Sequence, residues 1–258
     1  MAEMRGQKVE VNGINIHYEK IGNGSHVVLL LPGALGTSRT DFNEILEGGL
    51  DATKFTLIAW DPPGYGFSRP PERNYDKNVY RTDADLAAAL MKTLGYNFYS
   101  VIGWSDGGKT GVFLASTYPA VVDKLIVWGV VSFGLPHTNR AFEATRNMSF
   151  WDPAIKKRFT DVYGDDLEPM WNKLVADCFK HAIGQGVIIE QSVVEKIQCP
   201  AYVMHGDKDP MVAVEHAQYL NKHLCDARLK RFPQASHNLH QTCADEFHKI
   251  VTNFLLFE

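Results

Sequence analysis

The sequence lacks any hydrophobic run of the length that crosses a membrane. A transmembrane helix needs about 20 consecutive apolar residues, and an apolar run such as "VVLLL" at 27–31 is far shorter. Residues 1–13 also lack the apolar segment of a secretory signal peptide and the Arg- and Ser-rich character of a transit peptide. We therefore expect an intracellular protein without a membrane partner, either cytoplasmic or mitochondrial with its leader removed.

Cysteine and excess charge are both scarce. The cysteines show no CxxC pair and no disulfide-framework spacing, and no His/Cys cluster has the spacing of metal ligands. The net charge of −4 offers no attraction for nucleic acid. These features predict reduced thiols, no metal, no cofactor and no nucleic-acid partner, in a chain that we expect to be a monomer. The cysteines are Cys178, Cys199, Cys225 and Cys243.

What the sequence does contain is an alternation of strand and helix patterns. Residues 8–20 alternate apolar and polar side chains around Asn12-Gly13, which is a hairpin signal. Runs typical of buried parallel strands follow at 26–33, 55–61, 98–104, 124–130 and 201–206, with a more polar one at 228–232. Helical patterns lie between most of them, at 82–95, 213–224 and 243–256. An antiparallel start followed by this alternation predicts an α/β fold, a mostly parallel sheet with helices on both faces.

The segment 131–195 interrupts the alternation. It shows no clear strand and is rich in aromatic residues at helical spacing. We predict a helical cap inserted into a core formed by 1–130 and 196–258; the alternative is an ordinary crossover, which needs only a dozen or so residues. The aromatic residues are Phe133, Phe142, Phe150, Trp151, Phe159, Tyr163, Trp171 and Phe179.

The stretch "GWSDGG" at 103–108 fits the pattern G-x-S-x-G between a strand pattern and a helical one. In this arrangement a sharp strand–turn–helix raises the serine hydroxyl above the sheet, and bulky residues two positions away would collide with the neighbouring elements. The context predicts Ser105 as a nucleophile; a plain glycine-rich turn is the alternative.

A serine nucleophile needs a base and a group that orients the base. In this architecture the order is serine, acid, histidine, with each partner just after a strand. The segment after 201–206 offers Asp207 and Asp209, of which we prefer Asp209 and leave Asp207 as the alternative. The loop after the last strand offers His237 as the base, whereas His240 begins a helical pattern and is expected in a surface or capping role.

An oxyanion hole needs two backbone N–H groups. We predict one from Asp106, the residue after the nucleophile, and one from Ala34 in "LPGALG" at 31–36. The alternative is that Gly33 and Gly36 merely permit a turn.

With these pieces the chain resembles the α/β-hydrolases, and among them the valacyclovir hydrolase (biphenyl hydrolase-like) family, over about residues 8–254. The resemblance implies a serine esterase for α-amino acid esters, including ester prodrugs, with Ser105, Asp209 and His237 as its triad. It further implies that Asp106 holds the α-ammonium group of the substrate and that Met211 borders the leaving-group groove. The stretches that carry it are "LLLPGALG", "AWDPPGYGFSRPP", "GWSDGG", "VWG", "QCPAYVMHGDKDP" and "SHNLH…ADEF".

Two residues depart from the pattern of these relatives. Pro63 stands where many have arginine, which predicts a changed salt bridge near that loop. Lys109 replaces an apolar residue three positions after Asp106, a spacing at which the two side chains can pair along a helix. A paired Asp106 is a weaker receptor for an ammonium group.

An aspartate beside an oxyanion hole has a physical consequence. A carboxylate ~4–6 Å from the developing negative charge opposes it by about 3 kcal/mol at an effective dielectric near 20. A substrate with its own cation, such as an α-amino acid ester or an amino-acid thiolactone, removes that repulsion and is positioned by it. The alternative is that Asp106 only stabilises the helix N-terminus through the dipole.

Two other functions stay open on the same scaffold. A carbon–carbon bond hydrolase of aromatic ring-cleavage products uses a similar triad, but its substrates carry carboxylates, which Asp106 opposes. A non-catalytic ligand sensor commonly lacks a triad member, whereas this chain retains all three candidates. We therefore expect a small-molecule ester as the substrate.

Overall fold

The computed structural model describes residues 5–258, apart from the side chains of 178–185. Cys178 and Phe179, named in the predictions above, lie among those undescribed side chains. Eight strands form one sheet in the order β1-β2-β4-β3-β5-β6-β7-β8. The strands are β1 (Gln7–Val11), β2 (Ile14–Ile21), β3 (His26–Leu31), β4 (Phe55–Trp60), β5 (Tyr99–Trp104), β6 (Val122–Trp128), β7 (Ala201–Gly206) and β8 (Ala227–Phe232).

The first two strands form the predicted antiparallel hairpin, and β3–β8 run parallel to one another. The hairpin closes through Asn12 and Gly13, whose φ angles of 50° and 81° are those of the tight turn that Asn-Gly favours. The predicted fold class, a mostly parallel α/β sheet with an antiparallel start, is therefore confirmed.

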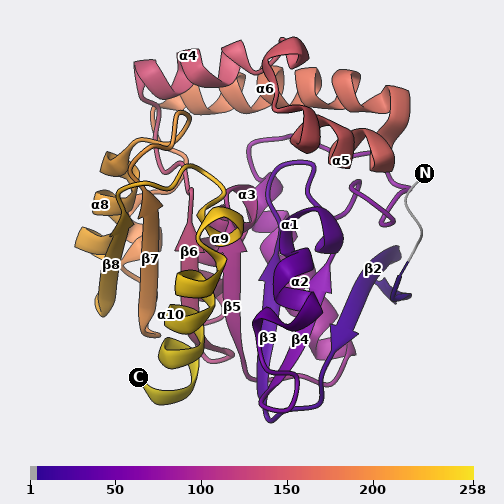
Figure 1. Cartoon of the computed structure of the whole chain (residues 1–258), viewed down its shortest axis with the longest axis vertical. Coiled ribbons are helices and arrows are strands. Elements are labelled where there is room, and N and C mark those ends of the chain that lie inside the picture. The colour runs from indigo at the N-terminus through magenta and orange to yellow at the C-terminus, as the bar shows by residue number, and fades with distance from the viewer. Residues whose placement is uncertain (1–4) are drawn as a thin grey trace.

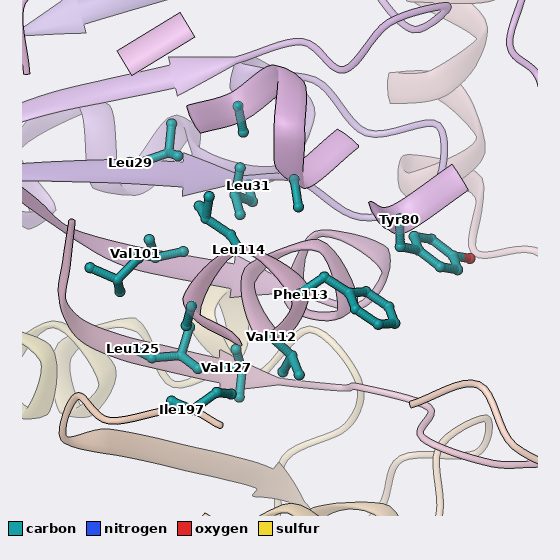
Figure 2. Packing of buried hydrophobic residues seen from close by; sticks show 14 of the residues in the cluster. Leu29, Leu31, Tyr80, Val101, Val112, Phe113, Leu114, Leu125, Val127 and Ile197 are labelled. Carbon is teal, nitrogen blue, oxygen red and sulfur yellow. The ribbon is translucent and has the colours of Figure 1, made fainter. Parts of the chain in front are cut away.

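Helices cover both faces of the sheet because successive strand residues point to opposite sides. Leu29 and Leu31 pack with α2 (Val79–Thr93) and α3 (Asp106–Thr117) on one face. Val28 and Leu30 pack with α1 (Ser38–Glu44) and α10 (Ala244–Phe257) on the other. Figure 2 shows the first of these layers, with side chains of α3 beside strand residues such as Leu31. The other helices of the core are the π-helical turn η1 (Ile45–Gly49), which follows α1, and α7 (Gln191–Val194), α8 (Val214–His223) and α9 (Leu239–Thr242).

The helices of residues 136–185, which follow β6, lie across one end of the sheet (Figure 1). Tyr163 joins them to the core, because its hydroxyl donates to Leu35 O at 2.7 Å and accepts from Gly66 N at 3.0 Å. The boundaries of the predicted cap, 131 and 195, stay a prediction; Val193 and Val194 pack in the same cluster as α3. These helices, called the cap helices below, are α4 (Pro136–Ala144), η2 (Met148–Phe150), α5 (Pro153–Tyr163), η3 (Gly164–Asp166) and α6 (Leu167–Gln185).

Two further observations concern the cysteines and the length of the helices. Cys199, Cys225 and Cys243 are free thiols. Burial raises the pKa of Cys199 to about 12, so that thiol stays protonated. Within residues 5–258, no helix is both long and apolar enough to span a bilayer.

Candidate active site

Ser105 lies at the junction between β5 and α3, at the end of the sheet that the cap helices cover. Its backbone has φ of 55° and ψ of −116°, a conformation that is strained for any residue except glycine. The Ser105 N–H donates to Trp128 O at 2.9 Å, which fixes the turn against β6.

Two glycines make this turn possible. A Cβ atom on Gly107 would lie 2.0 Å from Leu31 O, and one on Gly103 would lie 2.5 Å from Gly107 O. Any other residue would therefore push α3 away from the strands. This is the steric reason, inferred from the sequence, for a serine between glycines at a strand-to-helix corner.

Asp209 and His237 come from the loops after β7 and β8 and contact each other directly. Nδ1 of His237 lies 2.6 Å from Oδ2 of Asp209. The N–H groups of Met211 and Val212 donate to the other oxygen of Asp209, each at 2.9 Å. Burial alone raises the pKa of Asp209, but the charge and hydrogen bond of His237 and these two N–H groups outweigh it, so its pKa lies below the usual range. Asp209 is therefore an ionised group that fixes the ring of His237.

The His237 ring lies over the ends of β5 and β6. It packs against Trp104 with ring centroids 5.3 Å apart, and a Cβ on Gly129 would lie 2.7 Å from its Cε1 atom. Trp104 is the residue directly before Ser105. Trp128, the residue before Gly129, accepts the hydrogen bond from the Ser105 N–H through its carbonyl oxygen. Within the described residues, the hydrogen bond between the Ser105 hydroxyl and His237 is not formed; such bonds often tighten only when substrate is bound. The complete triad thus stays a prediction.

The two alternative candidates have other partners. Asp207 accepts a hydrogen bond from Arg231 Nε at 2.8 Å. His240 is almost wholly buried, so the prediction of a surface or capping role for it is wrong. Trp128 Nε1 donates a hydrogen bond to Nδ1 of His240 at 3.2 Å, and Nε2 of His240 donates one to Asp41 O at 2.9 Å. Burial lowers the pKa of His240 to about 3, so this residue is a neutral packing group.

The loop after β3 lies beside Ser105. A Cβ on Gly33 would come within 3.3 Å of the Ser105 Cβ, and Ala34 follows directly. Asp106 is the first residue of α3, so its N–H has no acceptor within the helix. Both groups are therefore near the nucleophile, and their role as the oxyanion hole stays a prediction.

Asp41 is a site residue that the sequence analysis missed. Its Oδ2 accepts a hydrogen bond from Gly33 N at 2.7 Å, and a Cβ on Gly36 would lie 2.0 Å from the same oxygen. The loop before Asp41 thus wraps around this carboxylate. Burial raises the pKa of Asp41 to about 6. The only signal in the sequence is an acidic residue in the first helical turn after a glycine-rich loop.

Lys109 forms the ion pair with Asp106 that the helical spacing predicts. Its Nζ lies 2.7 Å from Asp106 Oδ1 and donates to the Tyr80 hydroxyl at 3.1 Å. The side chains of Lys109 and Asp106 are only 8% and 13% exposed. Together the three residues form one wall of a hollow between the nucleophile turn and the cap helices. The other lining residues are Ala34, Val131, Phe133, Gly134, Thr138, Asn139, Phe142, Leu174, Val175 and Ile188.

Met211 is half-buried and holds Asp209 through its backbone. Among the described residues it does not line this hollow, and its contact with a leaving group stays a prediction.

The loop around Pro63 has a buried ion pair of its own. Arg73 Nη1 donates to Asp83 Oδ1 at 2.8 Å and to Pro63 O at 3.0 Å. The guanidinium of Arg73 therefore lies against the backbone of Pro63, and the predicted change of a salt bridge relative to other family members stays a prediction. In the part of the chain that the structure describes, no group of three or more His, Cys, Asp or Glu side chains is placed to hold a metal ion.

Comparison with known proteins identifies the class. The model of the alpha/beta hydrolase family matches residues 28–250, and the chain belongs to this family. It is 40% identical over 251 residues to the human serine hydrolase BPHL, covering 96% of this chain and 85% of that protein. The mouse BPHL is 39% identical over 252 residues, with the same coverage. The predicted resemblance to the biphenyl hydrolase-like proteins is confirmed, and the chain is a serine hydrolase.

More distant matches share the fold. A 2-hydroxy-6-oxo-6-phenylhexa-2,4-dienoate hydrolase from a Rhodococcus strain superimposes with a TM-score of 0.82 at 19% identity, covering 97% of this chain and 98% of that one. A 2-hydroxy-6-oxononadienedioate/2-hydroxy-6-oxononatrienedioate hydrolase from Pseudomonas is 24% identical, covering 95% of this chain and 93% of that protein. At these identities the likeness concerns the architecture alone.

Proposed function

We propose that this serine hydrolase cleaves carboxylic esters through an acyl-enzyme on Ser105. His237 takes the proton of the Ser105 hydroxyl as that oxygen attacks the ester carbonyl, and Asp209 orients and stabilises the imidazolium. The alcohol leaves with the proton from His237. Water, activated by the same imidazole, then attacks the acyl-enzyme and releases the acid. The observation that carries the proposal is the 2.6 Å contact between His237 and Asp209 at the sheet end where the strained Ser105 lies.

The oxyanion of each tetrahedral intermediate is held by the N–H groups of Ala34 and Asp106 in this scheme. Its support is the close approach of the Gly33 backbone to Ser105 and the position of Asp106 at the start of α3. The hollow above these groups is lined mainly by apolar residues of the cap, which suits the apolar part of a small ester.

The resemblance points to a finer substrate class for this reaction: α-amino acid esters, ester prodrugs of amino acids and amino-acid thiolactones. Two features support this finer class: the carboxylate of Asp106 in the wall of the hollow, and the 40% identity to human BPHL. One feature opposes it: the ion pair of Asp106 with Lys109 at 2.7 Å leaves less of the carboxylate's charge for the ammonium group of a substrate.

The rival carbon–carbon bond hydrolase would turn over a dienoate faster than any ester, and the sensor would turn over neither. Hydrolysis of a p-nitrophenyl ester and of a dienoate, followed from the pre-steady-state phase into the steady state, separates the three. We expect burst kinetics and turnover by the wild type and a loss of at least about 10³-fold in Ser105→Ala, the loss typical of a missing nucleophile. Equal rates in both proteins would refute the proposal, and a faster dienoate reaction would favour the rival.

A further inference from the structure

The Asp106–Lys109 pair is a built part of the pocket wall and not a surface contact. Lys109 follows Asp106 by one helical turn, and both side chains are largely removed from solvent. The Tyr80 hydroxyl accepts a hydrogen bond from the Lys109 Nζ at 3.1 Å, and the ring centre of Tyr80 lies 4.5 Å from the same nitrogen. The ammonium group is thus held between a carboxylate and an aromatic residue of α2.

The charges around this pair leave the pocket neutral. Of the described residues that line the hollow, only Asp106 and Lys109 carry charge, and their charges are opposite. The nearby Arg73 and Asp83 are paired with each other. A substrate in this hollow therefore meets no unbalanced negative group among the described residues that line it.

We propose that Lys109 is an internal counter-ion that occupies the cation-binding position of Asp106, so that this enzyme takes esters whose acyl group carries no ammonium next to the carbonyl. The proposal rests on the ester hydrolysis proposed above and narrows its substrate class. It makes Lys109 a specificity-determining residue.

The physical reason lies in what a substrate ammonium would gain at this site. In the absence of Lys109, an α-ammonium group would neutralise a carboxylate beside the developing oxyanion, and binding and rate would both rise. With Lys109 at 2.7 Å, that neutralisation is already complete. An incoming ammonium would share the carboxylate with a like charge that is tethered to the same helix and held by the Tyr80 hydroxyl, and would lose its own hydration.

An uncharged acyl group meets the opposite conditions. It needs no partner for a charge, and the apolar side chains of the cap fill the space around it. The Asp106 carboxylate does not oppose the oxyanion in this case, because Lys109 balances it during the whole reaction. Lys109 thus neutralises the Asp106 carboxylate from one helical turn away, so that a cationic substrate is not needed for this purpose.

A matched pair of esters tests the proposal: the benzyl ester of phenylalanine and the benzyl ester of 3-phenylpropanoate, which differ only in the amino group. The ratio of kcat/KM for the amino ester to kcat/KM for the des-amino ester is measured at a pH at which the amine is protonated. We expect a ratio of about one or less for the wild type, and a rise of about 10-fold or more in Lys109→Met, which keeps an unbranched side chain, shorter by one atom, and removes the charge. Lys109→Arg should leave the ratio close to that of the wild type.

The double variant Asp106→Asn/Lys109→Met removes both charges and should return the ratio to the wild-type value. It also serves as the control if the single variant is unstable, and thermal unfolding is measured for each protein. A wild-type ratio of ~10 or more that Lys109→Met leaves unchanged would overturn the proposal. Failure of the proposed function has a different signature, since neither ester would then be cleaved faster by the wild type than by Ser105→Ala.

Discussion

Nδ1 of His237 and Oδ2 of Asp209 lie 2.6 Å apart, although 28 positions separate the two residues in the chain. The contact sets the tautomer of the ring. Nδ1 carries the hydrogen and donates a hydrogen bond to Asp209, so Nε2 is unprotonated and can act as the base. The low pKa of Asp209 means that this carboxylate stays ionised at every pH at which the enzyme is expected to act.

The first prediction follows from this tautomer. In Asp209→Asn the amide can donate to Nδ1, which places the ring proton on Nε2 and removes the base. We expect kcat to fall by about 10³–10⁴-fold with little change in KM, by analogy with the same change in serine proteases. Asp207→Asn is the matched control, because Asp207 contacts Arg231 and not His237. A loss below 10-fold in Asp209→Asn would assign the orienting role to another group.

The second prediction concerns stability at low pH. His240 has a pKa of about 3 in the folded protein and near 6.5 in the unfolded chain. Between these two pH values the unfolded state binds a proton at this residue and the native state does not. Stability should therefore fall as pH drops below about 6.5, by roughly 2 kcal/mol at pH 5 from this residue alone. Urea unfolding at several pH values measures the slope.

His240→Gln is the variant for this test, since glutamine keeps a donor and an acceptor but does not titrate. Its stability should depend less steeply on pH between 5 and 7. Some dependence should persist, because burial also lowers the pKa of His216 to about 4. Identical slopes in the two proteins would show that His240 does not carry the effect.

The third prediction concerns the buried pair of Arg73 and Asp83. Arg73→Met leaves the Asp83 charge buried without its partner, and we expect the free energy of unfolding to fall by about 3–5 kcal/mol. Arg73→Met/Asp83→Leu removes both charges and should be distinctly more stable than the single variant. Chemical denaturation of the wild type and the two variants provides the comparison. A double variant less stable than Arg73→Met would mean that the two residues are not coupled.

The fourth prediction concerns the glycine after the nucleophile turn. Gly107→Ala places a methyl group 2.0 Å from Leu31 O and should displace α3, with loss of activity and a drop in stability of about 3 kcal/mol or more. Gly95→Ala is the control: Gly95 has φ of 85° but open space around it, so only ~1–2 kcal/mol of backbone strain is expected. Equal stability of the two variants would contradict the steric account of the turn.

Local patterns were sufficient to predict the hairpin, the parallel strands and most of the candidate site residues. The Asn12-Gly13 turn and the apolar strand runs predict the hairpin and the parallel sheet, because both signals depend on neighbours in sequence. The spacing of Asp106 and Lys109 likewise predicts their pairing.

Residues whose role depends on distant parts of the chain were not predictable in this way. The burial of His240 arises from its contacts with Trp128 and with Asp41, the latter 199 positions away. The contact of Asp41 with Gly33 depends on the path of a whole loop. Tyr80, which holds Lys109, lies on another helix. Each is a tertiary contact that no local pattern contains.

The central claim is that Ser105 is the nucleophile and that His237 activates it. Its most direct test is the reaction of the protein with a fluorophosphonate probe, followed by mass spectrometry of the digested adduct. The account predicts one adduct, on Ser105, that forms rapidly in the wild type, is absent in Ser105→Ala and forms much more slowly in His237→Ala. An adduct on a different residue, or ester hydrolysis that persists in a protein whose Ser105 has been blocked, would contradict it.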